Sequence, residues 1–320
     1  MKGLPAFHAG EQALQARVGV QERLAQIGDQ IMRDHMPDQH RAFFAELPFL
    51  IVGSLDAEHQ PWASVLANPP GFVQTPDARH LQIRAHPLPH DPLQTTLREG
   101  AALALLGLQP HTRRRNRLNG HAHLVDDGLV VEVGQSFGNC PKYIQAREPV
   151  FVPGAPAGTV EYEGPALDAA AQAMVRAADT FFIASAHPAA ASDLEPRHGV
   201  DVSHRGGKPG FVRVEGHVLT VPDFAGNRFF NTLGNIALHP RAGLLFVDFD
   251  TGERLYLAVR AEVIWSDPAL STFDGAERLL RMEVTQVRRV RGGLPLRWGP
   301  AEPSPYLHGT GAWPADRKGQ

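Results

Sequence analysis

Two hydrophobic patterns follow one another along this chain. Between residues 10 and 47, apolar side chains recur at about helical spacing among charged and amide residues, which predicts helix. From Phe49 onward the apolar runs are short and are separated by turns rich in proline, glycine and aspartate, which predicts strands. Helical patterns return at residues 91–100 and 167–180. The chain is therefore expected to be mainly β with flanking helices.

The second half of the chain repeats the first. The sequence PGFV occurs at residues 70–73 and again at 209–212, an offset of 139, and Ser64 and Ser203 each precede their copy by six positions. Further matches in the same order pair FLIVGS with FFIASA and GAALALLG with PRAGLLFV. Coincidental likeness between strands is the alternative, but collinear matches favour a duplication. Short strands with one interposed helix in each copy predict two small closed barrels.

This pattern also predicts how the chain is divided. Residues 149–165 are rich in proline, glycine and alanine, which is typical of a linker. The expected parts are an N-terminal helical segment (1–47), a first barrel unit (48–148), the linker (149–165), a second barrel unit (166–300) and a C-terminal tail (301–320).

Composition narrows the classes of function. The net charge of −3 over 320 residues gives no general attraction to nucleic acid or to an anionic membrane, so neither is an expected partner. The single cysteine, Cys140, excludes an intramolecular disulfide, and the N-terminal residues have no apolar signal core, so a cytoplasmic location is expected. The sixteen histidines are dispersed without the spacing of a metal site, and no metal is predicted.

One segment in each half carries a family resemblance. Residues 199–265 have two strands, a basic and polar turn, a helix, and then HPRAGLLF leading into a strand pair. This order resembles the pyridoxamine 5′-phosphate oxidase-like, FMN-binding split-barrel superfamily. In the first half, RRRNRLNGHAHL and QSFGNCPKYIQAR look like the branch of that superfamily in which two barrels occur in tandem.

The resemblance implies two tandem split β-barrels of Greek-key type that bind FMN, with FAD as the alternative flavin. It also implies a homodimer and a small-molecule substrate, and NAD(P)H as a candidate electron donor. Some members of the branch are fused to a reductase module. No dinucleotide fingerprint or cysteine cluster occurs in this sequence, so any such electron-transfer partner is expected to be a separate protein.

Candidate cofactor-binding residues in the second half lie in two polar segments, SHRGG and DFAGNRFFNTLGN. Arginine forks, hydroxyls and backbone N–H groups at a helix start are what a flavin phosphate requires. The alternatives are a solvated turn for the first segment and ordinary helix capping by its asparagines for the second. The candidates are Ser203, His204, Arg205, Gly206, Asp223, Asn227, Arg228 and Asn231.

The first half lacks basic residues at the matching positions, which predicts that the two copies are unequal. Its candidates are Trp62 and Ser64 on a strand, Arg115 and Arg117 alternating into another strand, and Lys142 in the GNCPK turn. Trp62 would form a wall against the flavin ring, with core packing as the alternative. The arginine run is also compatible with a solvated hairpin tip.

The function that this interpretation favours is an FMN-dependent oxidoreductase of the flavin reductase or oxidase type. It would transfer hydride between NAD(P)H or a small organic substrate and the flavin, and then to oxygen or another acceptor. The alternative is a non-catalytic protein of the same fold that carries flavin or haem. No catalytic residue is indicated by the sequence.

Overall fold

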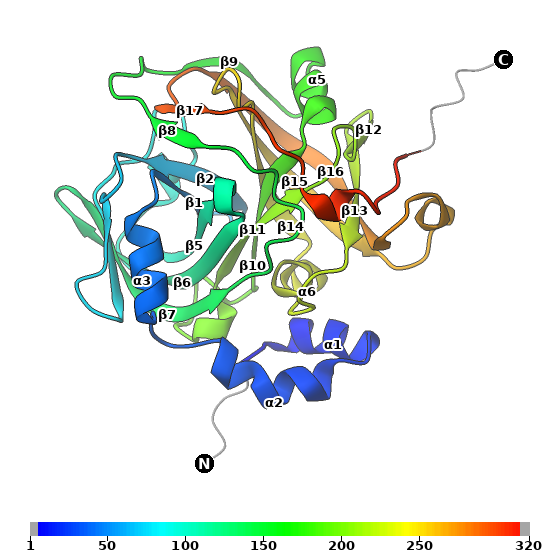
Figure 1. Cartoon of the computed structure of the whole chain (residues 1–320), viewed down its shortest axis with the longest axis horizontal. Coiled ribbons are helices and arrows are strands. Elements are labelled where there is room, and N and C mark those ends of the chain that lie inside the picture. The colour runs from blue at the N-terminus through cyan, green and yellow to red at the C-terminus, as the bar shows by residue number, and fades with distance from the viewer. Residues whose placement is uncertain (1–5, 314–320) are drawn as a thin grey trace.

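In the computed structural model, which describes residues 6–313, the chain folds into two antiparallel split barrels with the same topology (Figure 1). The first sheet has the strand order β2-β1-β5-β6-β7-β4-β3. The second has the order β11-β10-β14-β15-β16-β13-β12, and β9 pairs with β16 beside this path. Each strand of the first barrel therefore has a counterpart in the second. The predicted mainly β fold is confirmed, and the identical strand orders support the duplication.

The strands of the first sheet are β1 (Phe49–Leu55), β2 (Pro61–Ala67), β3 (Val73–Gln74), β4 (His80–Ile83), β5 (Ala102–Gln109), β6 (Arg114–Val125) and β7 (Gly128–Gly138). Those of the second are β9 (Thr159–Gly164), β10 (Thr180–Ala186), β11 (Val200–Gly206), β12 (Arg213–Glu215), β13 (Val218–Phe224), β14 (Arg241–Val247), β15 (Arg254–Ile264) and β16 (Ala276–Arg291). A separate pair is formed by β8 (Pro149–Phe151) and β17 (Leu296–Trp298).

The first strand of each barrel is buried on both faces. In β1, Leu50 and Val52 pack in the core of the first barrel, whereas Phe49 and Ile51 pack in a third cluster that contains residues of both barrels. This double burial explains why the strand is an uninterrupted apolar run rather than an alternating one. The two barrels are thus joined by a shared hydrophobic layer.

The barrels approach each other closely where β2 crosses β14. A Cβ atom added to Gly243 would lie 2.1 Å from the carbonyl oxygen of Pro61 and 2.6 Å from Cα of Trp62. Only glycine leaves room for the two backbones at this position. The same relation holds on the other side, where β11 packs against β5.

The helices lie on the outside of the two barrels. They are α1 (Ala9–Arg17), α2 (Gln21–Ile31), α3 (Asp38–Ala45), α4 (Leu93–Thr96), α5 (Ala169–Ala177) and α6 (Asn231–Leu238). Helix α1 packs on α6 of the second barrel, far along the chain (Figure 1). None of the helices between residues 6 and 313 is both long and apolar enough to cross a membrane.

The segments expected to be linker and tail contribute to the packing. Residues 149–165 contain β8 and β9, which pair with β17 and β16 near the end of the chain. In the tail, Ser304, Leu307 and Thr310 are buried, and residues 314–320 lie outside the described part. The C-terminal segment therefore closes against both barrels.

Candidate functional site

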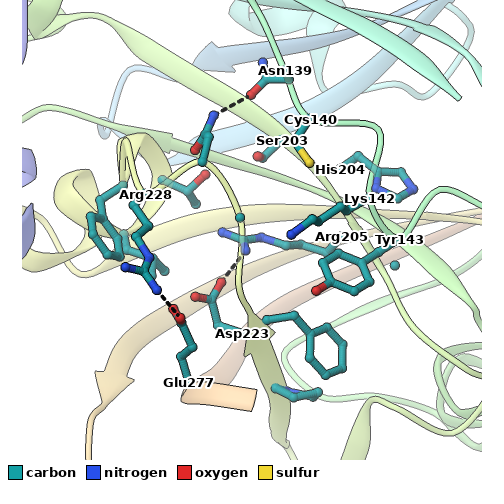
Figure 2. A pocket seen from close by; sticks show the side chains of 18 of the residues that line it. Asn139, Cys140, Lys142, Tyr143, Ser203, His204, Arg205, Asp223, Arg228 and Glu277 are labelled. Atoms are coloured by element: carbon teal, nitrogen blue, oxygen red, sulfur yellow. Dashed lines mark hydrogen bonds and ion pairs between the residues drawn. The ribbon is translucent and has the colours of Figure 1, made fainter. Parts of the chain in front are cut away.

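A pocket lies between the two barrels, and both halves of the chain line it. The space not filled by protein atoms is about 850 Å³, a figure that includes open solvent at the mouth. The lining comes from β6, the turn after β7, β11, β13, the loop before α6 and the start of β16 (Figure 2). Ten of the predicted residues line it: Arg115, Arg117, Lys142, Ser203, His204, Arg205, Gly206, Asp223, Asn227 and Arg228.

Strand β6 of the first barrel supplies two arginines to the second barrel's side of the pocket. Arg117 Nη1 lies 2.5 Å from Asp201 Oδ1, and its Nη2 donates to Ser203 Oγ. Arg115 Nε donates to the carbonyl oxygen of Cys140 at 2.8 Å. These two arginines therefore reach across the junction to the SHRGG strand.

The positive charge around Arg115 is poorly compensated. Burial, with the neighbouring Arg117 and Arg205 guanidiniums, lowers the pKa of Arg115 to about 9. A guanidinium stays protonated at neutral pH, so the direction of the shift reports uncompensated positive charge rather than loss of a proton. Burial and the adjacent arginines also hold the pKa of His204 well below its usual range, so His204 is neutral. An anion would relieve this arrangement.

A chain of alternating charges forms the opposite wall. Arg205 pairs with Asp223, and Arg278 Nε lies 3.2 Å from the other oxygen of the same carboxylate. Arg278 also pairs with Glu277, whose other oxygen lies 2.9 Å from Arg228 Nη2. Figure 2 shows Asp223 pointing toward Arg205 and Glu277 pointing toward Arg228. The wall therefore holds three guanidiniums on two carboxylates.

The charges around the pocket do not balance. Six cationic side chains, those of Arg115, Arg117, Lys142, Arg205, Arg228 and Arg278, line it. Three carboxylates pair with them, those of Asp201, Asp223 and Glu277, which leaves a net charge of +3. Arg117 Nε, Arg205 Nε and Arg278 Nη1 are buried and have no hydrogen-bond partner among the described residues. Buried N–H groups of this kind require an acceptor.

The loop before α6 adds a further donor surface. Arg228 and Phe230 adopt left-handed backbone with φ of 62° and 64°, a conformation that costs energy in residues other than glycine. Phe230 is the N-cap of α6, and no side chain of residues 6–313 caps the helix there. The helix start lines the pocket through Thr232 and Leu233. Its free N–H groups attract negative charge.

Two predicted residues on this loop have other partners. Asn227 Nδ2 donates to Asn139 Oδ1 at 3.1 Å, and its Oδ1 accepts from the N–H of Phe229 at 3.1 Å. Asn231 does not line the pocket. Its Oδ1 accepts from Arg117 Nη1 at 3.3 Å, and its amide donates to Glu11. Asn231 thus lies behind the pocket, where it supports Arg117.

Two aromatic side chains that the sequence interpretation missed, Tyr143 and Phe224, line the pocket, and Tyr306 lies next to Tyr143 outside the lining. Tyr143 lies beside Phe224, with ring centroids 5.0 Å apart, and its hydroxyl donates to the carbonyl oxygen of Ala225. Tyr306 of the C-terminal segment lies 6.2 Å from Tyr143, and Lys142 Nζ is 5.4 Å from the Tyr306 ring. Tyr143 directly follows Lys142 in the GNCPK turn, so its place in that turn was the one available signal.

Trp62 and Ser64, two of the predicted residues, do not line this pocket. Both are buried on β2, and Trp62 Nε1 donates to Asp56 Oδ2 at 2.9 Å. Trp62 packs in the shared layer between the barrels. The reason is topological, because β2 faces β14 while its counterpart β11 faces β5. These residues lie at the other junction of the two barrels.

Part of the chain is similar to a known protein family. Residues 36–152 match the family model described as pyridoxamine 5′-phosphate oxidase. The matched segment contains all the strands of the first barrel. The oxidase-like family includes flavin-binding oxidoreductases and haem-binding or haem-storing proteins, and its members typically bind flavin. The comparison with curated proteins found no match to this chain.

Three of the solved structures that resemble this chain match 37–39% of its length. A putative pyridoxamine 5′-phosphate oxidase from Lactobacillus delbrueckii is 14% identical, with 38% of this chain and 93% of that one covered at a TM-score of 0.29. A FAD-binding protein from Mesorhizobium loti is 13% identical, with 39% and 95% covered and a TM-score of 0.27. The haem storage protein HutZ from Vibrio cholerae is 10% identical, with 37% and 89% covered and a TM-score of 0.24.

Proposed function

We propose that this chain is an FMN-dependent oxidoreductase that holds its flavin in the pocket between the two barrels. The observation that supports the proposal most is the net charge of +3 around the pocket, together with the unpartnered N–H groups of Arg117, Arg205 and Arg278. A phosphate dianion with three acceptor oxygens fits such a set of donors. The oxidase-like family of the first barrel makes flavin the expected bearer of that phosphate.

Both barrels would contribute residues to flavin binding. Arg115, Arg117 and Arg205, with the Ser203 hydroxyl, would hold the phosphate because they converge from β6 and β11. Tyr143 and Phe224 would border the ring, since both line the pocket and their rings lie 5.0 Å apart. When bound, flavin supplies the redox chemistry by accepting hydride and passing electrons on. The chain's own residues bind the cofactor and exclude water, and none is assigned a proton-transfer role.

Binding is tested by titrating the full chain with FMN and with riboflavin while flavin fluorescence is measured. Riboflavin lacks the phosphate, so the proposal predicts clearly tighter binding of FMN. Arg115→Gln should weaken FMN about 10- to 100-fold, as expected for a lost hydrogen bond to a charged group worth about 1.5–3 kcal/mol. Arg98→Gln is the matched control, because Arg98 is exposed and outside the pocket. Equal affinity for both flavins, or no binding, would contradict the proposed site.

Activity is tested separately from binding. The FMN-loaded chain is mixed anaerobically with NADH or NADPH, and the flavin absorbance is followed. Bleaching supports an oxidoreductase. A flavin that binds tightly but is not reduced by either nucleotide or by small organic donors supports the carrier alternative, and preferential uptake of haem over FMN would refute the flavin assignment.

A further inference from the structure

Because the two barrels have the same strand order, the junction that contains the pocket has a counterpart. This second junction is formed by the equivalent strands with the roles of the two barrels exchanged. The two hairpins β1-β2 and β10-β11 can be matched residue by residue. At the turn, Leu55 lies opposite Pro61 in the first hairpin and Ala186 lies opposite Val200 in the second, and the paired stretches have the same length. On this match, Ile51, Leu106 and Arg117 occupy the positions of Phe182, Leu245 and Tyr256 in neighbouring strands. The strand ladders thus shift the sequence alignments of FLIVGS with FFIASA and of GAALALLG with PRAGLLFV by one residue. By the same ladders, Arg115 corresponds to Arg254, and Ser64 corresponds to Ser203.

The counterparts of the two pocket arginines form a closed cluster. Tyr256 hydroxyl donates to Asp91 Oδ2 at 2.8 Å, and Arg254 Nη1 lies 3.0 Å from the same hydroxyl oxygen. Asp91 also accepts from the backbone N–H groups of Leu93 at 2.8 Å and Val65 at 3.3 Å. Arg254 Nη2 also donates to the carbonyl oxygens of Gly292 at 3.2 Å and Pro89 at 3.4 Å, while its Nε has no hydrogen-bond partner among the described residues. The hydroxyl and the carboxylate of this cluster thus find their partners within the junction.

Charge and burial separate this cluster from the pocket. Arg254 and Tyr256 are 0% exposed and Asp91 is 1% exposed, so their side chains fill the junction. One guanidinium and one carboxylate leave no net charge, whereas the pocket carries +3. A carboxylate at this position would also repel a phosphate. The second junction therefore lacks both the room and the charge that the first one offers.

We infer that Arg254, Tyr256 and Asp91 form a plug that abolishes the second of two duplicated ligand sites, so that each chain holds one ligand. The inference rests on the proposed function for the identity of that ligand. It assigns the plug a structural role, and it makes the pair of barrels within one chain the complete binding unit. The two junctions differ at this pair of matched positions, where the first has Arg117 and the second has Tyr256. This difference changes both the charge of the junction and the shape of the side chain that occupies it.

The test is the number of FMN molecules bound per chain. The full chain, at a concentration well above the dissociation constant, is titrated with FMN, and bound flavin is separated by equilibrium dialysis. One FMN per chain is expected, and Arg115→Gln should abolish it under these conditions or weaken it at least 10-fold. Two per chain would overturn the plug while leaving the proposed function standing. A chain that binds no FMN would overturn both.

Variants of the plug locate the bound flavin. Tyr256→Phe keeps the ring that fills the junction and removes only its hydroxyl contacts. This variant should fold, as judged by circular dichroism, and should still bind one FMN with affinity unchanged within about twofold. Loss of FMN from the folded Tyr256→Phe chain, with Arg115→Gln unaffected, would place the ligand at the second junction and refute the inference.

Discussion

A buried carboxyl behind the pocket predicts how stability responds to pH. Glu11 of α1 is 4% exposed, and its oxygens accept from the backbone N–H of His8 at 2.7 Å and from the Asn231 amide. Burial raises the pKa of Glu11 to about 8, and the nearby Asp201 carboxylate adds to this rise. Burial lowers the pKa of His8 to about 3. The two side chains lie 3.5 Å apart but are both neutral at mildly acidic pH, so their contact is not an ion pair.

The sign and size of the effect follow from these values. The pKa of Glu11 is higher in the folded chain than its ordinary value of 4.5. Its contribution to the free energy of unfolding is therefore fully present below pH 4.5 and is lost as pH rises through 8. At about 1.4 kcal/mol per pH unit, the loss between pH 4.5 and pH 7 is about 3 kcal/mol. His8 acts in the opposite direction, since its contribution is present above pH 6.5 and is lost as pH falls through 3.

The variant Glu11→Gln isolates this contribution, because glutamine has the shape of the protonated acid and does not titrate. Urea unfolding of both proteins is measured at about pH 5 and at about pH 7.5, with the slope m checked for constancy. The free energy of unfolding of Glu11→Gln minus that of the parent should rise by about 3 kcal/mol between the two pH values. Subtracting the two proteins cancels the titration of His8 and of the other histidines.

Glu22→Gln on the exposed face of α2 is the control, and its difference from the parent should stay flat. If the difference for Glu11→Gln is also flat, Glu11 is ionised in the folded chain near neutral pH. The Asn231 amide of α6 would then donate to a charged carboxylate of α1 rather than to a neutral carboxyl group.

Three further predictions concern the pocket and the helix that covers it. Gly234→Ala should lower the free energy of unfolding by about 1–3 kcal/mol in a urea titration, because the added Cβ would lie 2.7 Å from the backbone of α1. This loss is expected although alanine is otherwise the better helix former. The control Gly226→Ala, which has open space around the added Cβ, should change the free energy of unfolding little. Asp201→Asn should lower the free energy of unfolding by about 3 kcal/mol, because it removes the carboxylate that pairs with the buried Arg117. Inorganic phosphate should raise the melting temperature of this variant more than that of the parent. Equal shifts in melting temperature would argue against anion binding beside Arg117. Arg228→Ala should weaken FMN binding less than about tenfold in the fluorescence titration, because the Arg228 side chain is 40% exposed and already paired with Glu277. A larger loss of affinity would indicate that the phosphate binds at the loop before α6.

Much of the fold is readable in the sequence because it depends on local patterns. Buried runs such as FLIVGSL and the turns between them indicate strands, and the repeated PGFV and its preceding serines indicate two copies. The polar segments SHRGG and GNRFFN mark the second copy as the better anion site. These are properties of neighbouring residues, and they survive whatever the strands later pack against.

The tertiary structure alone decided which of these residues meet. Ser64 and Ser203 occupy equivalent places in the two copies, yet only Ser203 lines the pocket. Arg117 reaches Asp201, 84 positions away, because β11 of the second barrel packs against β5, the neighbour of β6 in the first. No local pattern encodes such a contact, since it depends on which faces two barrels bury against each other, and a register shift of one residue would exchange those faces. The sequence by itself therefore determined two unequal barrels, and the packing between them determined that one junction is an open, positively charged pocket and the other is filled by Tyr256 and its partners.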